Sequence, residues 1–148
     1  MFALLLAERG VEVIGIDPAR ASIDVARAKP GGDRVRWICG DATALPPLRV
    51  DLVTMTANVA QAISDPWLWQ KTLRVAYASL RPGGCLVFES RDPVAGHVLT
   101  SESTLRFRER SEIEGGLSSQ GFVVDDIRDA PDRPGKEFVF LVQRPEAG

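Results

Sequence analysis

Two aspartates stand where short apolar runs end, and both could bind a polar small molecule. Asp17 follows the run Val11–Ile16, and Asp41 follows the run that begins at Val35, with a helix-like segment between the two runs. In open parallel α/β sheets, ligands bind beyond the carboxyl ends of the strands, so carboxylates at consecutive strand ends can reach one molecule. One carboxylate accepts hydrogen bonds from both hydroxyls of a cis-diol, and a second accepts from an exocyclic amine. The pair therefore indicates a site for a ribose and an adenine, although either residue alone could be a simple turn former.

Three further polar residues are candidates for the same end of the sheet. Asn58 and Gln61 lie in a polar loop after the third predicted strand, and Arg91 directly follows the strand that ends at Ser90. Strand ends of this kind face the ligand, so Arg91 could contact a substrate. A polar loop needs no ligand, and both interpretations stay open for Asn58 and Gln61. His97 is the only histidine, and without a His or Cys partner at ligand spacing it predicts no metal site.

The first two thirds of the chain alternate between strand and helix patterns. Gly10 and the Pro82-Gly83-Gly84 run are helix-ending signals, and Asp65-Pro66 is a helix-starting pair. Leu5 and Leu6 are expected on the apolar side of the first helix. The alternation predicts an α/β fold with a parallel, doubly wound sheet. Helices are predicted over Phe2–Arg9, Ala19–Ala28 and Trp67–Leu80, and strands over Val11–Ile16, Val35 to Asp41, Val50–Thr56 and Cys85–Ser90.

The last third has a different pattern. Thr104–Arg110 alternates as an exposed strand would, and Ser111–Gln120 reads as a helix with Ser111 as its N-cap and Glu114 completing a capping box. Two strands follow, Phe122–Ile127 and Glu137–Gln143, and the helix-free loop between them predicts an antiparallel pair.

Composition and charge predict a single domain over residues 1–148. A chain of this length with 45% hydrophobic residues can bury a sizeable core, and its net charge of -2 leaves no basic stripe for nucleic acid. No apolar run reaches the roughly 20 residues that a membrane-spanning helix needs, so we expect no membrane partner. Cys39 and Cys85 fall in separate predicted strands and are expected to be buried free thiols, which favours a cytoplasmic location.

The order of elements and several motifs resemble the class I S-adenosylmethionine-dependent methyltransferases of the small methyltransferase-domain type. The resemblance spans roughly Phe2 to Arg144 and is carried by Val13–Asp17, Gly40–Ala42, the Leu80–Gly84 turn and the closing hairpin. It implies a Rossmann-like, doubly wound, mostly parallel sheet with a C-terminal antiparallel hairpin.

The resemblance also assigns functions to residues. It implies S-adenosylmethionine as the cofactor, with Asp17 and the adjoining Pro18 at the ribose and Asp41 with the backbone of Ala42 at the adenine. Asn58 and Gln61 would lie near the transferred methyl group, and Arg91 near a small-molecule acceptor. Catalysis in most such enzymes is alignment of an electrophilic sulfonium, so no catalytic base is assigned.

The chain departs from the family pattern at its start. The family's first strand and its Gly-rich loop precede the helix that begins here at Phe2, so we expect the sequence to be an N-terminally incomplete domain. The missing strand is the central one, and its loss is expected to leave a gap between the strands that end at Asp17 and Thr56. Unpaired edges of this kind are costly and favour a partner or a homodimer.

Two other function classes stay open on the sequence. A nicotinamide-dependent oxidoreductase also places an acid at the second strand's end, but Tyr77, the sole tyrosine, is followed four residues on by Arg81 instead of the required lysine. A non-catalytic binding or assembly module that retains the fold is the third interpretation.

Overall fold

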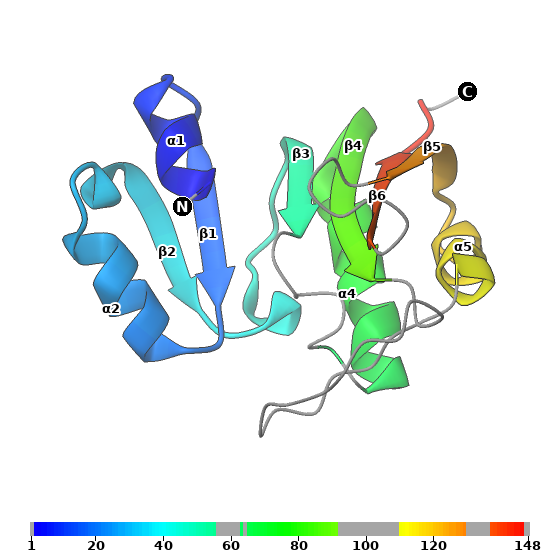
Figure 1. The fold of residues 1–148 in the computed structure, drawn as a ribbon, viewed down its shortest axis with the longest axis horizontal. Coiled ribbons are helices and arrows are strands. Elements are labelled where there is room, and N and C mark those ends of the chain that lie inside the picture. Colours follow the sequence, from blue (N-terminus) through cyan, green and yellow to red (C-terminus); the bar gives the residue numbers. More distant parts are fainter. Residues whose placement is uncertain (1, 56–62, 64, 92–109, 130–136, 147–148) are drawn as a thin grey trace. The chain divides into compact units, whose positions relative to one another are not determined.

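Strands and helices follow one another along the chain in the order that the hydrophobic pattern predicts. The computed structural model describes residues 2–55, 63, 65–91, 110–129 and 137–146, in two units, Met1–Pro46 and Pro47–Gly148 (Figure 1). The first unit contains α1 (Phe2–Glu8), β1 (Val13–Asp17), α2 (Arg20–Ala28), β2 (Val35–Cys39) and two short 3-10 turns, η1 (Gly32–Arg34) and η2 (Ala42–Ala44). The second contains β3 (Val50–Met55), α4 (Pro66–Ser79), β4 (Leu80–Arg91), α5 (Arg110–Ser119), β5 (Val123–Asp129) and β6 (Glu137–Gln143).

The first unit is built on a strand, helix, strand motif. β1 pairs with β2 in parallel, from Val13 opposite Val35 to Asp17 opposite Cys39. The connecting helix α2 buries Ile23 and Ala26, which stand three residues apart and therefore share one face. This agrees with the periodicity of the sequence, and the helix leads the chain back so that β2 runs beside β1 in the same direction.

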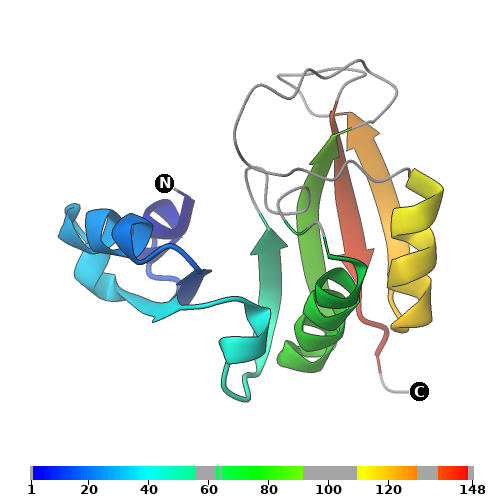
Figure 2. The same ribbon diagram turned by 90° about the horizontal axis from the view of Figure 1, so that it is seen from below.

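The second unit is a mixed sheet with the strand order β3-β4-β6-β5 (Figure 2). β3 and β4 are parallel, whereas β6 is antiparallel to both of its neighbours. The parallel start and the closing antiparallel hairpin confirm the predicted fold class. The described strands form two separate hydrogen-bonded sheets. Among them, β1 pairs only with β2, and β3 pairs only with β4.

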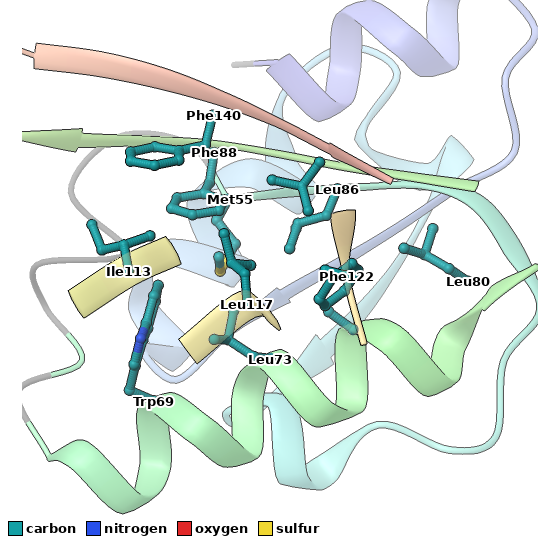
Figure 3. Close-up of a cluster of buried hydrophobic side chains, with 12 residues drawn as sticks. Met55, Trp69, Leu73, Leu80, Leu86, Phe88, Ile113, Leu117, Phe122 and Phe140 are labelled. Carbon is teal, nitrogen blue, oxygen red and sulfur yellow. The ribbon is translucent and has the colours of Figure 1, made fainter. Parts of the chain in front are cut away.

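The core of the second unit lies between its sheet and the helices α4 and α5 (Figure 3). Phe88 of β4 and Phe140 of β6 are opposite in register and stack with ring centroids 5.0 Å apart, and the Trp69 ring lies at 75° to the Phe88 ring with centroids 5.9 Å apart. Leu73 of α4 and Leu117 of α5 are fully buried in the same cluster. Both helices therefore cover one face of this sheet.

Side-chain hydrogen bonds hold both ends of α4. At the junction between α4 and β4, the side chain belongs to a residue that follows β6. Asp65 caps the start of α4 by accepting a hydrogen bond from the Trp67 amide at 2.9 Å, as its sequence predicts. At the other end, the Arg144 guanidinium donates to the carbonyls of Tyr77 and Leu80 at 2.8 and 2.7 Å. The Tyr77 carbonyl, in the last turn of α4, also accepts from the Leu80 amide, and Leu80 is the first residue of β4. Arg144 therefore links the end of α4 to the start of β4.

The outer strand β5 carries charge and an irregularity. Its pairing with β6 shifts register between Val124 and Asp126, as a β-bulge does. Asp125, Arg128 and Asp129 are exposed on it, and Arg128 donates to the Asp126 carboxylate at 2.7 Å. This hydrogen bond lowers the pKa of Asp126 below the usual aspartate value.

Three expectations for the helices are wrong in detail. Leu5 is 55% exposed, because α1 turns Ala7 inward and residues two apart lie on different sides of a helix. α5 begins at Arg110, so Ser111 is inside the helix and is neither an N-cap nor part of a capping box. The Arg110 guanidinium lies 4.6 Å from the Phe138 ring centroid. The exposed strand expected over Thr104–Arg110 is therefore wrong at Arg110, and its other residues lie outside the described ones.

Two expectations for the strands are also corrected. The Leu80–Gly84 segment is not a separate turn before β4. The strand starts at Leu80, and its pairing with β3 shifts between Val50 and Leu52 to accommodate the extra residues. Cys39 is exposed, because it lies at the open carboxyl end of β2, whereas Cys85 is half-buried.

Replacing Leu73 by Ala should lower the free energy of unfolding by about 2 to 5 kcal/mol, because it leaves a cavity at a fully buried position. The urea midpoint followed by circular dichroism measures this. Leu52→Ala, at a position 46% exposed in the same unit, is the matched control and should change the midpoint much less. Equal shifts for the two variants would contradict the packing described for the core.

Candidate functional site

The carboxyl ends of β1 and β2 bring two carboxylates to one edge of the first unit's sheet. The register places Asp17 opposite Cys39, which precedes Asp41 by only two residues. The Gly40 amide donates to the Asp17 carbonyl at 3.0 Å and extends the strand pairing into the loop. Asp17 and Asp41 therefore lie at adjacent strand ends, as their positions in the sequence predict.

Asp17 shapes the turn that leads into α2. Its Oδ1 accepts a hydrogen bond from the Ala19 amide at 2.8 Å, spanning Pro18. The Cys39 thiol lies 3.7 Å from the Pro18 carbonyl, to which it donates, so the turn is held from the neighbouring strand as well. The second oxygen of Asp17 has no partner among the described residues and is free to accept from a ligand.

Asp41 is the N-cap of the 3-10 turn η2. Its Oδ1 accepts from the Thr43 amide at 2.8 Å and also from the Thr43 hydroxyl. These two hydrogen bonds, the one from the hydroxyl above all, lower the pKa of the Asp41 carboxyl, so it carries its charge at neutral pH. Ala42 is the first residue of η2 and is half-buried.

Thr43 has a contact that the sequence interpretation missed. An Asp followed two residues later by Thr is the spacing of an Asx turn, in which the aspartate side chain accepts from the backbone two residues on. That spacing is visible in the sequence, but it does not say that the threonine hydroxyl adds a second bond to the same oxygen.

A close contact with Trp37 limits which side chains β1 can hold at Gly15. Gly15 of β1 stands opposite Trp37 of β2, and a Cβ at Gly15 would lie only 2.5 Å from a carbon of the indole ring. The indole is held in place by a hydrogen bond from its Nε1 to the Gly32 carbonyl at 2.9 Å. Gly15 is thus a position where only glycine fits without a shift of the ring, two residues before Asp17.

The other predicted site residues, or their side chains, fall outside the part of the chain that the structure describes. Asn58, Gln61 and His97 lie outside the described residues. Arg91 is the last residue of β4, opposite Glu137 of β6, and its side chain also falls outside the described part.

Trp67 is exposed and Trp69 is buried, as their spacing on α4 requires. Trp69 is 2% exposed in the core, whereas Trp67 is 66% exposed, with the Lys71 amine 5.6 Å from its ring centroid. Two residues apart on α4 they face different directions. Trp67 is therefore the surface residue of the pair.

The tyrosine expected of an oxidoreductase is used for packing. The Tyr77 ring packs edge-on against Phe122 with centroids 5.0 Å apart, and the Arg144 guanidinium lies 4.5 Å from its ring centroid. Arg81, four residues on, forms an ion pair with Asp51 at 2.9 Å. The two residues thus serve separate contacts and do not form a catalytic pair.

The described residues contain neither a candidate metal cluster nor a helix suited to span a membrane. No cluster of three or more His, Cys, Asp or Glu side chains suited to a metal ion occurs in the described segments. Within the same segments, none of the helices combines the length and apolarity that a membrane crossing requires.

Comparison with known families identifies the family of this chain. The family described as "Methyltransferase domain" matches residues 1–84, which is more than half of the sequence and includes both aspartates. The chain belongs to this methyltransferase domain family. The matched segment runs through the whole first unit and into β4 of the second.

A curated relative supports the assignment over a similar length. The biotin biosynthesis bifunctional protein BioHC of Cellvibrio japonicus is 36% identical over 85 residues, covering 56% of this chain and 16% of that protein. The curated relatives that match are much longer, and the chain spans less than two fifths of their length.

Solved structures share the methyltransferase-domain fold. The CcbJ methyltransferase from Streptomyces caelestis aligns with a TM-score of 0.79 at 18% identity, over 96% of this chain and 78% of its own. The [4+2]-cyclase SpnF aligns with a TM-score of 0.74 at 16% identity, over 98% of this chain and 70% of its own. At such low identity these alignments show the fold alone, and the second carries a different name for its activity.

Replacing Gly15 by Ala should lower the free energy of unfolding of this methyltransferase domain chain by about 1 to 3 kcal/mol, because the added methyl group overlaps the Trp37 ring. In the double variant Gly15→Ala/Trp37→Leu the methyl group has room, so its cost should be smaller than the sum of the two single changes. Urea unfolding of all four proteins measures the coupling. Additive costs would show that the contact does not constrain β1.

Proposed function

We propose that this methyltransferase domain chain binds S-adenosylmethionine and transfers its methyl group to a small-molecule acceptor. The observation that carries the proposal is the pair of carboxylates at the adjacent ends of β1 and β2, inside the segment that matches the family. Asp17 would accept from the ribose hydroxyls, with Pro18 beside it. Asp41 would accept from the adenine amino group, while the Ala42 backbone meets a ring nitrogen.

The donors of the cofactor fit the acceptors that these residues offer. Asp17 and Asp41 each use one oxygen for a backbone amide and keep the other without a partner among the described residues. The hydroxyls of a ribose diol and the amine of an adenine can both donate hydrogen bonds, and such oxygens need donors. The turns are held before any ligand arrives, which lowers the entropy lost on binding.

The contribution of the protein is binding and alignment. When bound, the cofactor supplies an electrophilic methyl group on a sulfonium, and positioning it against an acceptor provides much of the rate enhancement. We assign Asn58 and Gln61 to the neighbourhood of that methyl group and Arg91 to the acceptor. No residue is assigned as a general base.

The proposal extends to the whole molecule. We propose that residues 1–148 form a single domain, which is supported by a family match that spans the first unit and continues into the second as far as residue 84. The free thiols of Cys39 and Cys85 favour a cytoplasmic location.

The strand edges of β1 and β3 that lack a described partner favour a homodimer. Light scattering of the purified protein would detect it as twice the 16.1 kDa chain mass.

Replacing Asp17 by Ala should weaken the binding of S-adenosylhomocysteine by about 1.5 to 3 kcal/mol, because a charge-assisted pair of hydrogen bonds to the ribose is lost. Isothermal titration calorimetry measures the change. Asp24→Ala, which removes an exposed carboxylate on the adjacent helix α2, is the matched control and should bind like the parent protein.

A second ligand locates the effect of Asp17. The 2′,3′-dideoxy analogue of S-adenosylhomocysteine has no hydroxyls for Asp17, so the Asp17→Ala variant and the parent should bind it equally. An unchanged dissociation constant for S-adenosylhomocysteine in the variant would remove Asp17 from the site. No binding by the parent protein would favour the non-catalytic module, and tight binding of NAD(H) in its place would favour the oxidoreductase.

A further inference from the structure

The Asp41 carboxylate is held by one residue in an asymmetric way. The Thr43 amide and the Thr43 hydroxyl both donate to Oδ1, and Oδ2 accepts nothing from the described residues. An ionised carboxylate oxygen has two lone-pair sites, so Thr43 occupies both sites of Oδ1. Any ligand that approaches Asp41 therefore meets Oδ2.

The same two bonds fix the chemical character of that oxygen. They favour the ionised form of Asp41 and lower its pKa, while the opposing effect of burial is smaller. Asp41 forms no ion pair within the described part of the chain, and the acid at the neighbouring strand end is Asp17. An ionised carboxylate only accepts hydrogen bonds, so Oδ2 offers an acceptor and never a donor at neutral pH.

We propose that Thr43 is a specificity-determining positioning residue, which presents Oδ2 of Asp41 as a fixed acceptor and so selects a 6-amino purine over a 6-oxo purine. The inference rests on the proposed function, because it assumes that Asp41 faces the purine of the cofactor. A 6-amino group donates to Oδ2, whereas a 6-oxo group would place a second acceptor against it and leave both without a proton.

An exchange of Asp41 for Asn provides the sharpest consequence. The two donors of Thr43 orient an amide at this position, because only the amide oxygen can accept both of them. The amide nitrogen then occupies the place of Oδ2 and donates instead of accepting. Asp41→Asn should therefore reverse the preference and favour the 6-oxo purine, provided that Thr43 is intact.

The test compares S-adenosylhomocysteine with S-inosylhomocysteine by isothermal titration calorimetry at pH 7. The parent protein should bind the adenosyl compound about 10- to 100-fold more tightly. Thr43→Val retains the backbone amide and loses the hydroxyl, and it should reduce this ratio about 3- to 10-fold. Thr43→Ser restores the hydroxyl and should restore the ratio, while Asp41→Asn should bring it below one.

The outcomes separate the inference from the proposed function. If the parent binds S-adenosylhomocysteine and Thr43→Val keeps the parent's ratio, the inference is overturned and the proposed function stands. A ratio above one in Asp41→Asn would also overturn it. If the parent binds neither compound, the proposed function fails and the selection of a purine fails with it.

A ligand-free measurement tests the contact itself. The pH dependence of the Asp41 carboxyl carbon signal, followed by nuclear magnetic resonance, should show a higher pKa in Thr43→Val than in Thr43→Ser or the parent, because a bond to the charged form is lost. Thr43 is exposed, and circular dichroism should confirm that all variants fold. Identical titration in the parent and Thr43→Val would show that the hydroxyl does not hold the carboxylate.

Discussion

The parallel pairing of β1 with β2 is the constraint on which the candidate site depends. Because Asp17 stands opposite Cys39 and the Gly40 amide donates to the Asp17 carbonyl, the two strand ends cannot move independently. The positions of both carboxylates follow from backbone hydrogen bonds, which are insensitive to most side-chain changes. The Asx turns at Asp17 and Asp41 then set the orientation of each side chain. A site of this kind is preorganised, with its acceptors supported by regular structure.

The chemistry of the site is that of binding, and the methyltransferase domain fold alone does not decide the reaction. A [4+2]-cyclase and a methyltransferase align with this chain almost equally well, so the fold is shared by proteins whose names give different activities. What distinguishes a member is the set of groups at its strand ends and loops. For this chain, the proposed ribose and adenine contacts depend on the hydrogen-bond acceptors of Asp17 and Asp41.

The sequence predicted what depends on local pattern and missed what depends on contacts between distant or hydrogen-bonded side chains. The spacing of Ile23 and Ala26 identified the buried face of α2, and the positive φ of Gly10 confirms the predicted end of α1. The exposure of Cys39 was missed because a strand pattern does not tell where its sheet is covered. The hydroxyl of Thr43 was missed because a turn signal specifies backbone bonds and is silent on a hydroxyl rotor. The two aspartates were placed correctly at adjacent strand ends, and their ligand contacts stay predictions.

The charged, bulged outer strand β5 determines how this sheet behaves in a concentrated solution. A flat strand with free amides and carbonyls recruits strands from other molecules, and this growth is the first step of edge-to-edge aggregation. The register shift at Asp126 twists β5 out of a regular ladder, and the exposed Asp125, Arg128 and Asp129 would have to lose their water if a second strand docked beside them. The charge and the bulge of β5 therefore oppose edge-to-edge association on this side of the sheet.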